Sequence, residues 1–196
     1  TVTSCDITLT ATSADTSTAT SATISVAITD INEADASAPT DSNSATNTVA
    51  ENAAVAATVG LTALSSDSDG STNTITYTVS AQSCANLFGV GSSTGVVTIA
   101  ATTNLNYEAA TSCTVTILAS SADGSSASTE FTVAVTDINE FDASTPTDSN
   151  SGTNTVAENA AVAATVGLTA ASSDSDGSTN TIPYTVSAQS CAGLFG

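Results

Sequence analysis

Short acidic motifs recur along this chain at a fixed interval, and their residue types could do chemistry. Asp30–Glu33 returns as Asp137–Glu140, and Asp67–Asn73 returns as Asp174–Asn180. The chain carries 19 acidic residues and no Lys, Arg or His, so no carboxylate can pair with a cationic side chain. Clustered carboxylates must then be solvated, protonated or held by metal ions.

The charge of the chain excludes several classes of function. With no basic side chain, nothing can neutralise the phosphates of a nucleic acid or bind an anionic membrane surface. Nucleophilic catalysis by Ser or Thr lacks a His or Lys base. Paired carboxylates of a glycosidase are formally available, but they belong to motifs repeated in every copy. We therefore expect no enzyme.

The longest repeat defines the organisation of the chain. Residues 37–89 return as residues 144–196 with five changes, a period of 107 residues that suits a string of small domains. We expect the C-terminal part of one domain at 1–33, a complete domain at 34–140 and the N-terminal part of another at 141–196. The simpler account of the two partial domains is that the 196 residues are a window cut from a longer array of such domains. The alternative is that the tail of one molecule completes the head of the next, with Cys191 paired to the next Cys5.

Alternation of apolar and polar residues is the main local signal. Val115, Ile117 and Ala119 should face one way, and Phe131, Val133 and Val135 repeat the pattern. The further strands that we expect are 48–50, 58–63, 74–80, 87–90 and 96–100, and the Ala-rich stretch 53–57 is expected to be strand or loop. About seven strands in one period predict an all-β fold of tandem seven-stranded Greek-key β-sandwiches.

The four cysteines suggest one pair in each domain. Cys84 and Cys113 lie within one period and can meet if their strands are antiparallel neighbours. Cys5 and Cys191 would then pair outside this window or between chains. Small buried thiols are the alternative, and the absence of CxxC spacing and His argues against metal ligation by Cys. Disulfides favour an oxidising, extracellular location.

The ordered set of acidic motifs resembles tandem cadherin repeats of the microbial, cadherin-like kind. In that family, motifs from two successive domains close around calcium at each junction. The resemblance implies that one junction uses Glu51, Asn106, Glu108, Asp137, Asn139, Glu140, Asp174, Asp176 and Asn180. It implies that the other uses Asp30, Asn32, Glu33, Asp67, Asp69, Asn73 and Asp123. Asn106 and Glu140 stand where the family usually has Asp.

The chemistry of these side chains suits calcium, which takes six to eight oxygen ligands. Solvated acids in turns are the alternative interpretation, and it explains a single Asp-Ser-Asp-Gly better than the ordered set. The resemblance implies an extracellular, cadherin/Ig-like stalk or filament made of near-identical domains and made rigid by calcium, with like domains of the same chain or of neighbouring fibre subunits as partners.

The alternative function is a calcium-dependent cell-surface adhesin that binds a protein or a glycan. Near-identity of the copies favours the structural element, because a binding domain usually differs from its spacers. Tyr77, Phe88 and Phe131 fall in strand patterns and are expected in the core, which argues against a carbohydrate-binding module. Dense Ser and Thr without an Asn-x-Ser/Thr sequon leaves O-glycosylation open.

Overall fold

The structure is a computed structural model that describes residues 3–101, 105–191 and 193–195. Within these residues the regular structure consists of β-strands. In order they are β1 (Ser4–Ile7), β2 (Thr10–Thr12), β3 (Thr18–Thr20), β4 (Ile24–Ala27), β5 (Thr40–Asp41), β6 (Thr48–Ala50), β7 (Thr58–Leu64), β8 (Ile75–Gln82), β9 (Phe88–Val90), β10 (Val96–Ile99), β11 (Ser112–Ser121), β12 (Ser126–Thr136), β13 (Thr147–Asp148) and β14 (Ala170–Ala171). The all-β prediction is confirmed.

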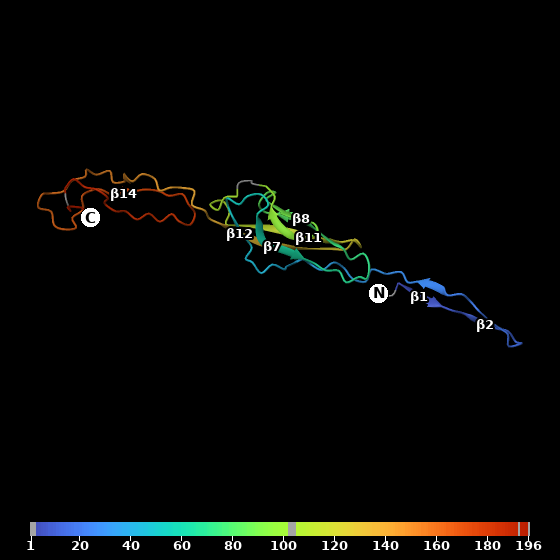
Figure 1. Ribbon diagram of the computed structural model, residues 1–196. Coiled ribbons are helices and arrows are strands. Elements are labelled where there is room, and N and C mark those ends of the chain that lie inside the picture. The colour runs from blue at the N-terminus through green and yellow to red at the C-terminus, as the bar shows by residue number, and fades with distance from the viewer. Residues whose placement is uncertain (1–2, 102–104, 192, 196) are drawn as a thin grey trace.

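Strands β5 to β12 form a sandwich in the middle of the chain (Figure 1). One sheet has the order β5-β7-β10-β9, and the other has the order β6-β12-β11-β8. Neighbouring strands are antiparallel except β6, which pairs in parallel with β12. The expected strands are all present within one or two residues of their predicted ends. Strand β5 was not predicted, because it has only two residues and both are polar.

The core lies between the two sheets and follows the predicted alternation. Val115, Ile117 and Ala119 of β11 are fully buried, whereas the residues between them are half-buried. Tyr77 and Phe88 are buried as predicted, and Phe131 packs against the core from a half-buried position. The Ala-rich stretch 53–57 is a loop with turns. The outer faces are rich in Thr and Ser, whereas the buried positions are mainly Val, Ile, Leu and Ala. The β-branched Thr, Val and Ile suit strands.

A disulfide joins Cys84, just after β8, to Cys113 in β11. The two strands are antiparallel neighbours, and the Cα atoms of the cysteines are 5.6 Å apart. The predicted pairing is therefore confirmed. Cys5 and Cys191 are free and exposed.

The segments on either side of the sandwich are smaller sheets (Figure 1). At the N-terminal side, β1 pairs with β4 and β2 with β3, which together make one long hairpin. At the C-terminal side, β13 pairs with β14. The domain boundaries at 33/34 and 140/141, and the number of tandem domains, stay predictions. Among the described residues, no helix has the length and apolarity to cross a lipid bilayer.

Candidate metal centres at two junctions

Two groups of carboxylates gather at the ends of the central sandwich. We call the first junction the region of residues 30–34, the loop 67–73 and Asp123. The second junction comprises residues 137–141, the loop 174–180, Glu51 and Glu108. Each junction brings together segments that are far apart in the sequence.

At the second junction, four carboxylates converge. Glu51, Glu108, Asp137 and Glu140 each offer an oxygen, and these oxygens lie within 4.8 Å of one another. Glu51 is buried directly after β6, and its two carboxylate oxygens accept hydrogen bonds from the N–H groups of Tyr107 (2.7 Å) and Ile138 (2.6 Å). These bonds fix Glu51 between the loop that carries Glu108 and the segment that follows β12.

Asp176 connects residues 137–141, which we call the linker of the second junction, to the loop 174–180. Its Oδ1 atom accepts hydrogen bonds from the N–H groups of Glu140 and Phe141, each 3.1 Å long. Its side chain is only 1% exposed, yet the Oδ2 atom has no hydrogen-bond partner among the described residues. Asp137 has the same property: Oδ2 accepts from Ser178, and the buried Oδ1 has no partner there. A buried carboxylate oxygen without a partner is costly, so these atoms point to a cation.

The first junction repeats this arrangement 107 residues earlier. Asp69 Oδ1 accepts from the N–H groups of Glu33 and Ala34, each at 3.0 Å, while the buried Asp69 Oδ2 has no partner in the described part of the chain. Oxygens of Asp67, Asp69 and Asp123 lie within 4.8 Å of one another. Asp30 accepts from the N–H of Ser71 at 2.9 Å, as Asp137 does from Ser178.

Hydrogen bonding and crowding shift the pKa of two carboxyls in these clusters. The N–H of Ser125, followed by its hydroxyl, holds the pKa of Asp123 below its ordinary value. Asn32 also donates to Asp123, from Nδ2 to Oδ2 at 2.7 Å. Loss of solvation, with the negative charges of Glu51 and Glu108, raises the pKa of Glu140. The second cluster therefore resists holding all of its negative charges without a counter-ion.

The donor set identifies the kind of ion that fits. All candidate donors are oxygens of carboxylates, side-chain amides and the main chain, which suit hard cations such as calcium rather than soft transition metals. Among the described residues, the buried carboxylate oxygens without a hydrogen-bond partner belong to Asp69, Asp137 and Asp176, at these two junctions. The chain has no cationic side chain to occupy the space. The residues present therefore fit an oxygen-ligated divalent cation.

Most of the predicted site residues lie at the two junctions, but they differ in what they contact. The hydrogen bonds above or the shared carboxylate clusters join Glu51, Glu108, Asp137, Glu140, Asp176, Asp30, Asn32, Asp67, Asp69 and Asp123. Asp174 Oδ1 accepts from the N–H of Asp176, and Asn73 donates to the carbonyl oxygen of Asp69. Glu33 takes part through its main chain. Asn139 and Asn180 are exposed, without hydrogen bonds in the described structure. The role of each as a ligand stays a prediction.

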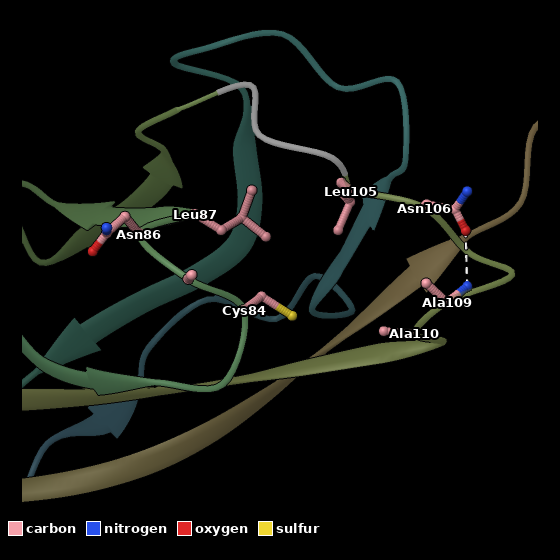
Figure 2. Close-up of a pocket in the computed structure, with 8 residues that line it drawn as sticks. Cys84, Asn86, Leu87, Leu105, Asn106, Ala109 and Ala110 are labelled. Atoms are coloured by element: carbon pink, nitrogen blue, oxygen red, sulfur yellow. Dashed lines mark hydrogen bonds between the residues drawn. The ribbon is translucent and has the colours of Figure 1, made fainter.

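Asn106 contacts a different part of the molecule. Its Oδ1 atom accepts a hydrogen bond of 2.8 Å from the N–H of Ala109 and closes a turn. Asn106 also lines a hollow of about 410 Å³ beside the disulfide (Figure 2), together with Cys84, Leu87 and Leu105. The dashed line in Figure 2 shows the turn, which fixes the loop that carries Glu108.

Serine hydroxyls contribute contacts that the sequence did not single out. Ser71 and Ser178 donate to the linker aspartates, Ser121 donates to Asp67, and Ser125 donates to Asp123. In a chain so rich in Ser, no individual serine stands out. The identical Asp-Gly-Ser in both copies was the available signal, because Ser71 and Ser178 follow the glycine in each.

Comparison with known proteins agrees with the architecture. Residues 45–136 match the family described as the cadherin domain. Similar solved structures include the protocadherin gammaB7 EC3-6 cis-dimer, at 21% identity over 88% of this chain and 43% of that chain, with a TM-score of 0.60. Mouse cadherin-23 EC22-24 is 21% identical over 89% of this chain and 55% of that chain, with a TM-score of 0.58. Mouse protocadherin-24 EC1-3 is 23% identical over 92% of this chain and 58% of that chain, with a TM-score of 0.61.

These likenesses show the fold. The chain spans less than half of the protocadherin gammaB7 chain that it matches. No curated protein sequence matches the chain. The family match, the sandwich of strands β5 to β12 and the order of the acidic motifs around it agree with one another. Residues 45–136 therefore match the cadherin domain family in sequence, and the sandwich has the fold of the cadherin structures described above.

Proposed function

We propose that the chain is part of an extracellular stalk or filament built of cadherin-like domains and stiffened by calcium at their junctions. One observation carries the proposal: Asp69, Asp137 and Asp176 each have a buried carboxylate oxygen without a partner in the described structure, at the two junctions where we expect one domain to meet the next. A divalent cation would satisfy these oxygens and neutralise the carboxylates around them.

The proposed ligands come from both sides of each junction. At the second junction, Glu51, Glu108, Asp137, Glu140 and Asp176 would hold calcium, with Asp174, Asn139, Asn180 and Asn106 as the further predicted ligands. At the first junction, Asp67, Asp69 and Asp123 would hold it, with Asp30, Asn32, Glu33 and Asn73. Bound calcium would replace repulsion between carboxylates by shared coordination, so the two sides of a junction would move as one body.

Near-identity of the copies supports a structural role. Neither copy of the repeated segment carries an inserted loop, and the five differences between them are single substitutions. Like domains are the partners proposed for this chain. An adhesive role is the second candidate, because the solved structure of the similar protocadherin gammaB7 is described as a cis-dimer.

Calcium titration with a paired set of variants tests the proposal. Isothermal calorimetry of the 196-residue chain should show calcium binding, and small-angle scattering should show a longer, stiffer molecule with calcium than with a chelator. E108Q/D137N should lose binding at the second junction. Glu130 is exposed on β12 outside both clusters, so E130Q should bind calcium like the parent chain. Absence of calcium binding, or equal loss in E130Q, would refute the proposal.

A further inference from the structure

The loop 105–111 lies between the disulfide of the sandwich and the second junction. It leads directly into β11, whose second residue is Cys113. The same loop carries Glu108, a member of the carboxylate cluster at the second junction, and Tyr107, whose N–H donates to Glu51. A change in the position of this loop would therefore move two of the contacts that define the junction.

The turn at Asn106 gives the loop its shape but does not attach it to the rest of the sandwich. The carbonyl oxygen of Asn106 accepts from the N–H groups of Ala109 (3.2 Å) and Ala110 (3.0 Å), and both partners lie within the loop. At the end of the loop, the carbonyl oxygen of Thr111 accepts from the N–H of Val135 at 2.9 Å. The loop is therefore tied to its surroundings mainly where it enters β11.

The hollow beside the disulfide lies between this loop and the loop 83–87. It has a volume of about 410 Å³, and its lining includes Cys84 and Leu87 from one loop and Leu105 and Ala110 from the other. Figure 2 shows the side chain of Cys84 pointing toward the side that Leu105 and Ala110 line. Atoms on opposite sides of an open space make no van der Waals contact, so packing across the hollow cannot fix the loops relative to each other. The disulfide supplies that connection covalently.

The two sulfurs of the disulfide differ in accessibility. Cys113 is 0% exposed, whereas Cys84 is half-buried and lines the hollow. Thiol–disulfide exchange depends on which sulfur an attacking thiolate can reach. A small thiol can enter the hollow and reach the sulfur of Cys84 without passing through the core.

We propose that the Cys84–Cys113 disulfide is a redox control of the second junction: a small thiol reduces it through the hollow, and the released loop 105–111 holds calcium less tightly. This inference rests on the proposed calcium function of that junction and adds its regulation. In the oxidised chain, the disulfide fixes the start of β11 against the loop 83–87, and with it the loop that carries Glu108. In the reduced chain, the loop gains freedom that calcium binding must remove.

The reduction uses a low-molecular-weight thiol such as glutathione. Its thiolate attacks the sulfur of Cys84, the bond to Cys113 breaks, and Cys113 leaves with the electron pair and takes up a proton. A second glutathione thiolate then attacks the glutathione sulfur of the mixed disulfide, and Cys84 leaves as a thiolate that is protonated. Two glutathione thiols are oxidised to one disulfide, and the protein disulfide is reduced to two thiols.

Calcium and the disulfide must affect each other by the same factor, because coupling between two equilibria is reciprocal. We expect reduction to weaken calcium binding at the second junction by about tenfold. Saturating calcium should then lower the midpoint potential of the disulfide by about 30 mV, which is the same factor of ten for a two-electron couple. Calcium therefore protects the disulfide, and the disulfide strengthens the junction.

Calorimetry of the oxidised and reduced forms tests the coupling. C5S/C191S is the background, because it leaves Cys84 and Cys113 as the two cysteines of the chain. The reduced form should bind calcium about tenfold more weakly at the second junction, and a glutathione redox titration with calcium or a chelator should give the matching shift. Calcium binding of equal strength in both forms would overturn this inference but leave the proposed function. Absence of binding in both forms would refute the proposed function itself.

The first junction serves as an internal control. Its carboxylate cluster consists of Asp67, Asp69 and Asp123 and contains no residue of the loop 105–111. When E108Q/D137N is added to the background to remove the second site, reduction should leave the remaining calcium affinity unchanged. A loss of affinity there as large as at the second junction would show that reduction acts on the whole chain, and would overturn the proposal.

Hydrogen exchange in the presence of a chelator gives a measurement that does not depend on calcium. Reduction should speed exchange at the N–H groups of Tyr107, Ala109 and Ala110, which belong to the loop. Residues 115–119, in the middle of β11, should keep their protection because their pairing with β8 and β12 remains. Unchanged exchange in the loop, or loss of protection throughout β11, would contradict a local effect on the loop.

Two variants separate the position of the loop from the stability of the sandwich. In the same background, C84A/C113A should bind calcium as weakly as the reduced form and should no longer respond to glutathione. L61A removes core contacts in β7, which belongs to the other sheet, and keeps the disulfide. Oxidised L61A should therefore keep the calcium affinity of the background. An equal loss of affinity in L61A would show that general destabilisation is the cause, and would overturn the proposal.

Discussion

Glu108 and Gly177 are 69 residues apart in the sequence, and the Oε1 atom of Glu108 accepts a hydrogen bond of 2.9 Å from the N–H of Gly177. The glycine is necessary for this approach. A Cβ atom at position 177 would lie 2.6 and 2.8 Å from ring atoms of Tyr107 and 3.1 Å from Glu108 Oε1. The second junction is therefore a close contact between the segment of Tyr107 and Glu108 and the loop 174–180, as well as a cluster of carboxylates.

G177A should loosen this junction, because the Tyr107 ring or the loop must move to admit the methyl group. We expect faster hydrogen exchange at the N–H groups of residues 176–178 and calcium affinity about tenfold weaker, or ~1.4 kcal/mol. The matched control is G152A, because the central copy already has Ala45 at the corresponding position. Unchanged exchange and affinity in G177A would show that the contact does not position the site.

Asp176 offers a sharper test of the buried oxygens. D176N keeps the shape of the side chain but removes its negative charge, so calcium affinity at the second junction should fall by about tenfold or more, at least ~1.4 kcal/mol. Without calcium, the same change should raise the melting temperature, because it removes a buried negative charge that has no cationic partner. D15N is the control, since Asp15 is exposed at the turn of the N-terminal hairpin. Equal affinities in D176N and the parent chain would remove Asp176 from the site.

Much of this fold could be predicted from the sequence because every second residue of a strand faces the core, so apolar residues recur with a period of two. The alternation of Val115, Ile117 and Ala119 is sufficient to predict β11 and its inner face. Strand β5 could not be found in this way, because Thr40 and Asp41 form a strand through pairing with Leu64 and Ala63. Its existence depends on a neighbour that is distant in sequence.

The junction was predictable in outline but not in its contacts. Repetition revealed which acids belong together, because Asp69 and Asp176 recur in identical surroundings. Sequence could not show that one oxygen of each is taken by two linker N–H groups while the other has no partner. That distinction depends on the path of the linker. The packing of Gly177 against Tyr107 depends on how two repeats meet, which has no local sequence signal.

Asp148 should titrate at an unusually low pH. The N–H of Thr169, the amide of Asn154 and the N–H of Asn150 donate to its carboxylate and hold its pKa below the ordinary value of 3.8. The charged form is favoured in the folded state, so its contribution to stability is present above the unfolded pKa and lost as the pH falls through the folded one. Carboxyl NMR should give a titration midpoint below 3.8, and N154A should raise it. A midpoint at or above 3.8 in the parent chain would contradict these hydrogen bonds.

Removal of the central disulfide should destabilise the sandwich. Cys84 and Cys113 are 29 residues apart, and closure of a loop of this size contributes about 3 to 4 kcal/mol in the chain-entropy model. C84A/C113A should therefore melt at a lower temperature than the parent chain under non-reducing conditions. C5S/C191S should melt like the parent in dilute solution, because Cys5 and Cys191 are exposed. Equal loss in the two double variants would show that the effect comes from thiols in general.

Leu61 and Leu168 test directly whether the central copy alone has a complete core. They occupy the same place in the repeated sequence, but Leu61 is 1% exposed and Leu168 is 58% exposed. L61A should cost about 2 to 5 kcal/mol of unfolding free energy, because it leaves a cavity between the sheets. L168A should change it by less than about 0.5 kcal/mol when both variants are measured in dilute solution without reductant, which leaves the Cys84–Cys113 disulfide intact. A comparable loss in both variants would mean that the C-terminal segment buries Leu168 in its own core, contrary to the exposed position of that side chain.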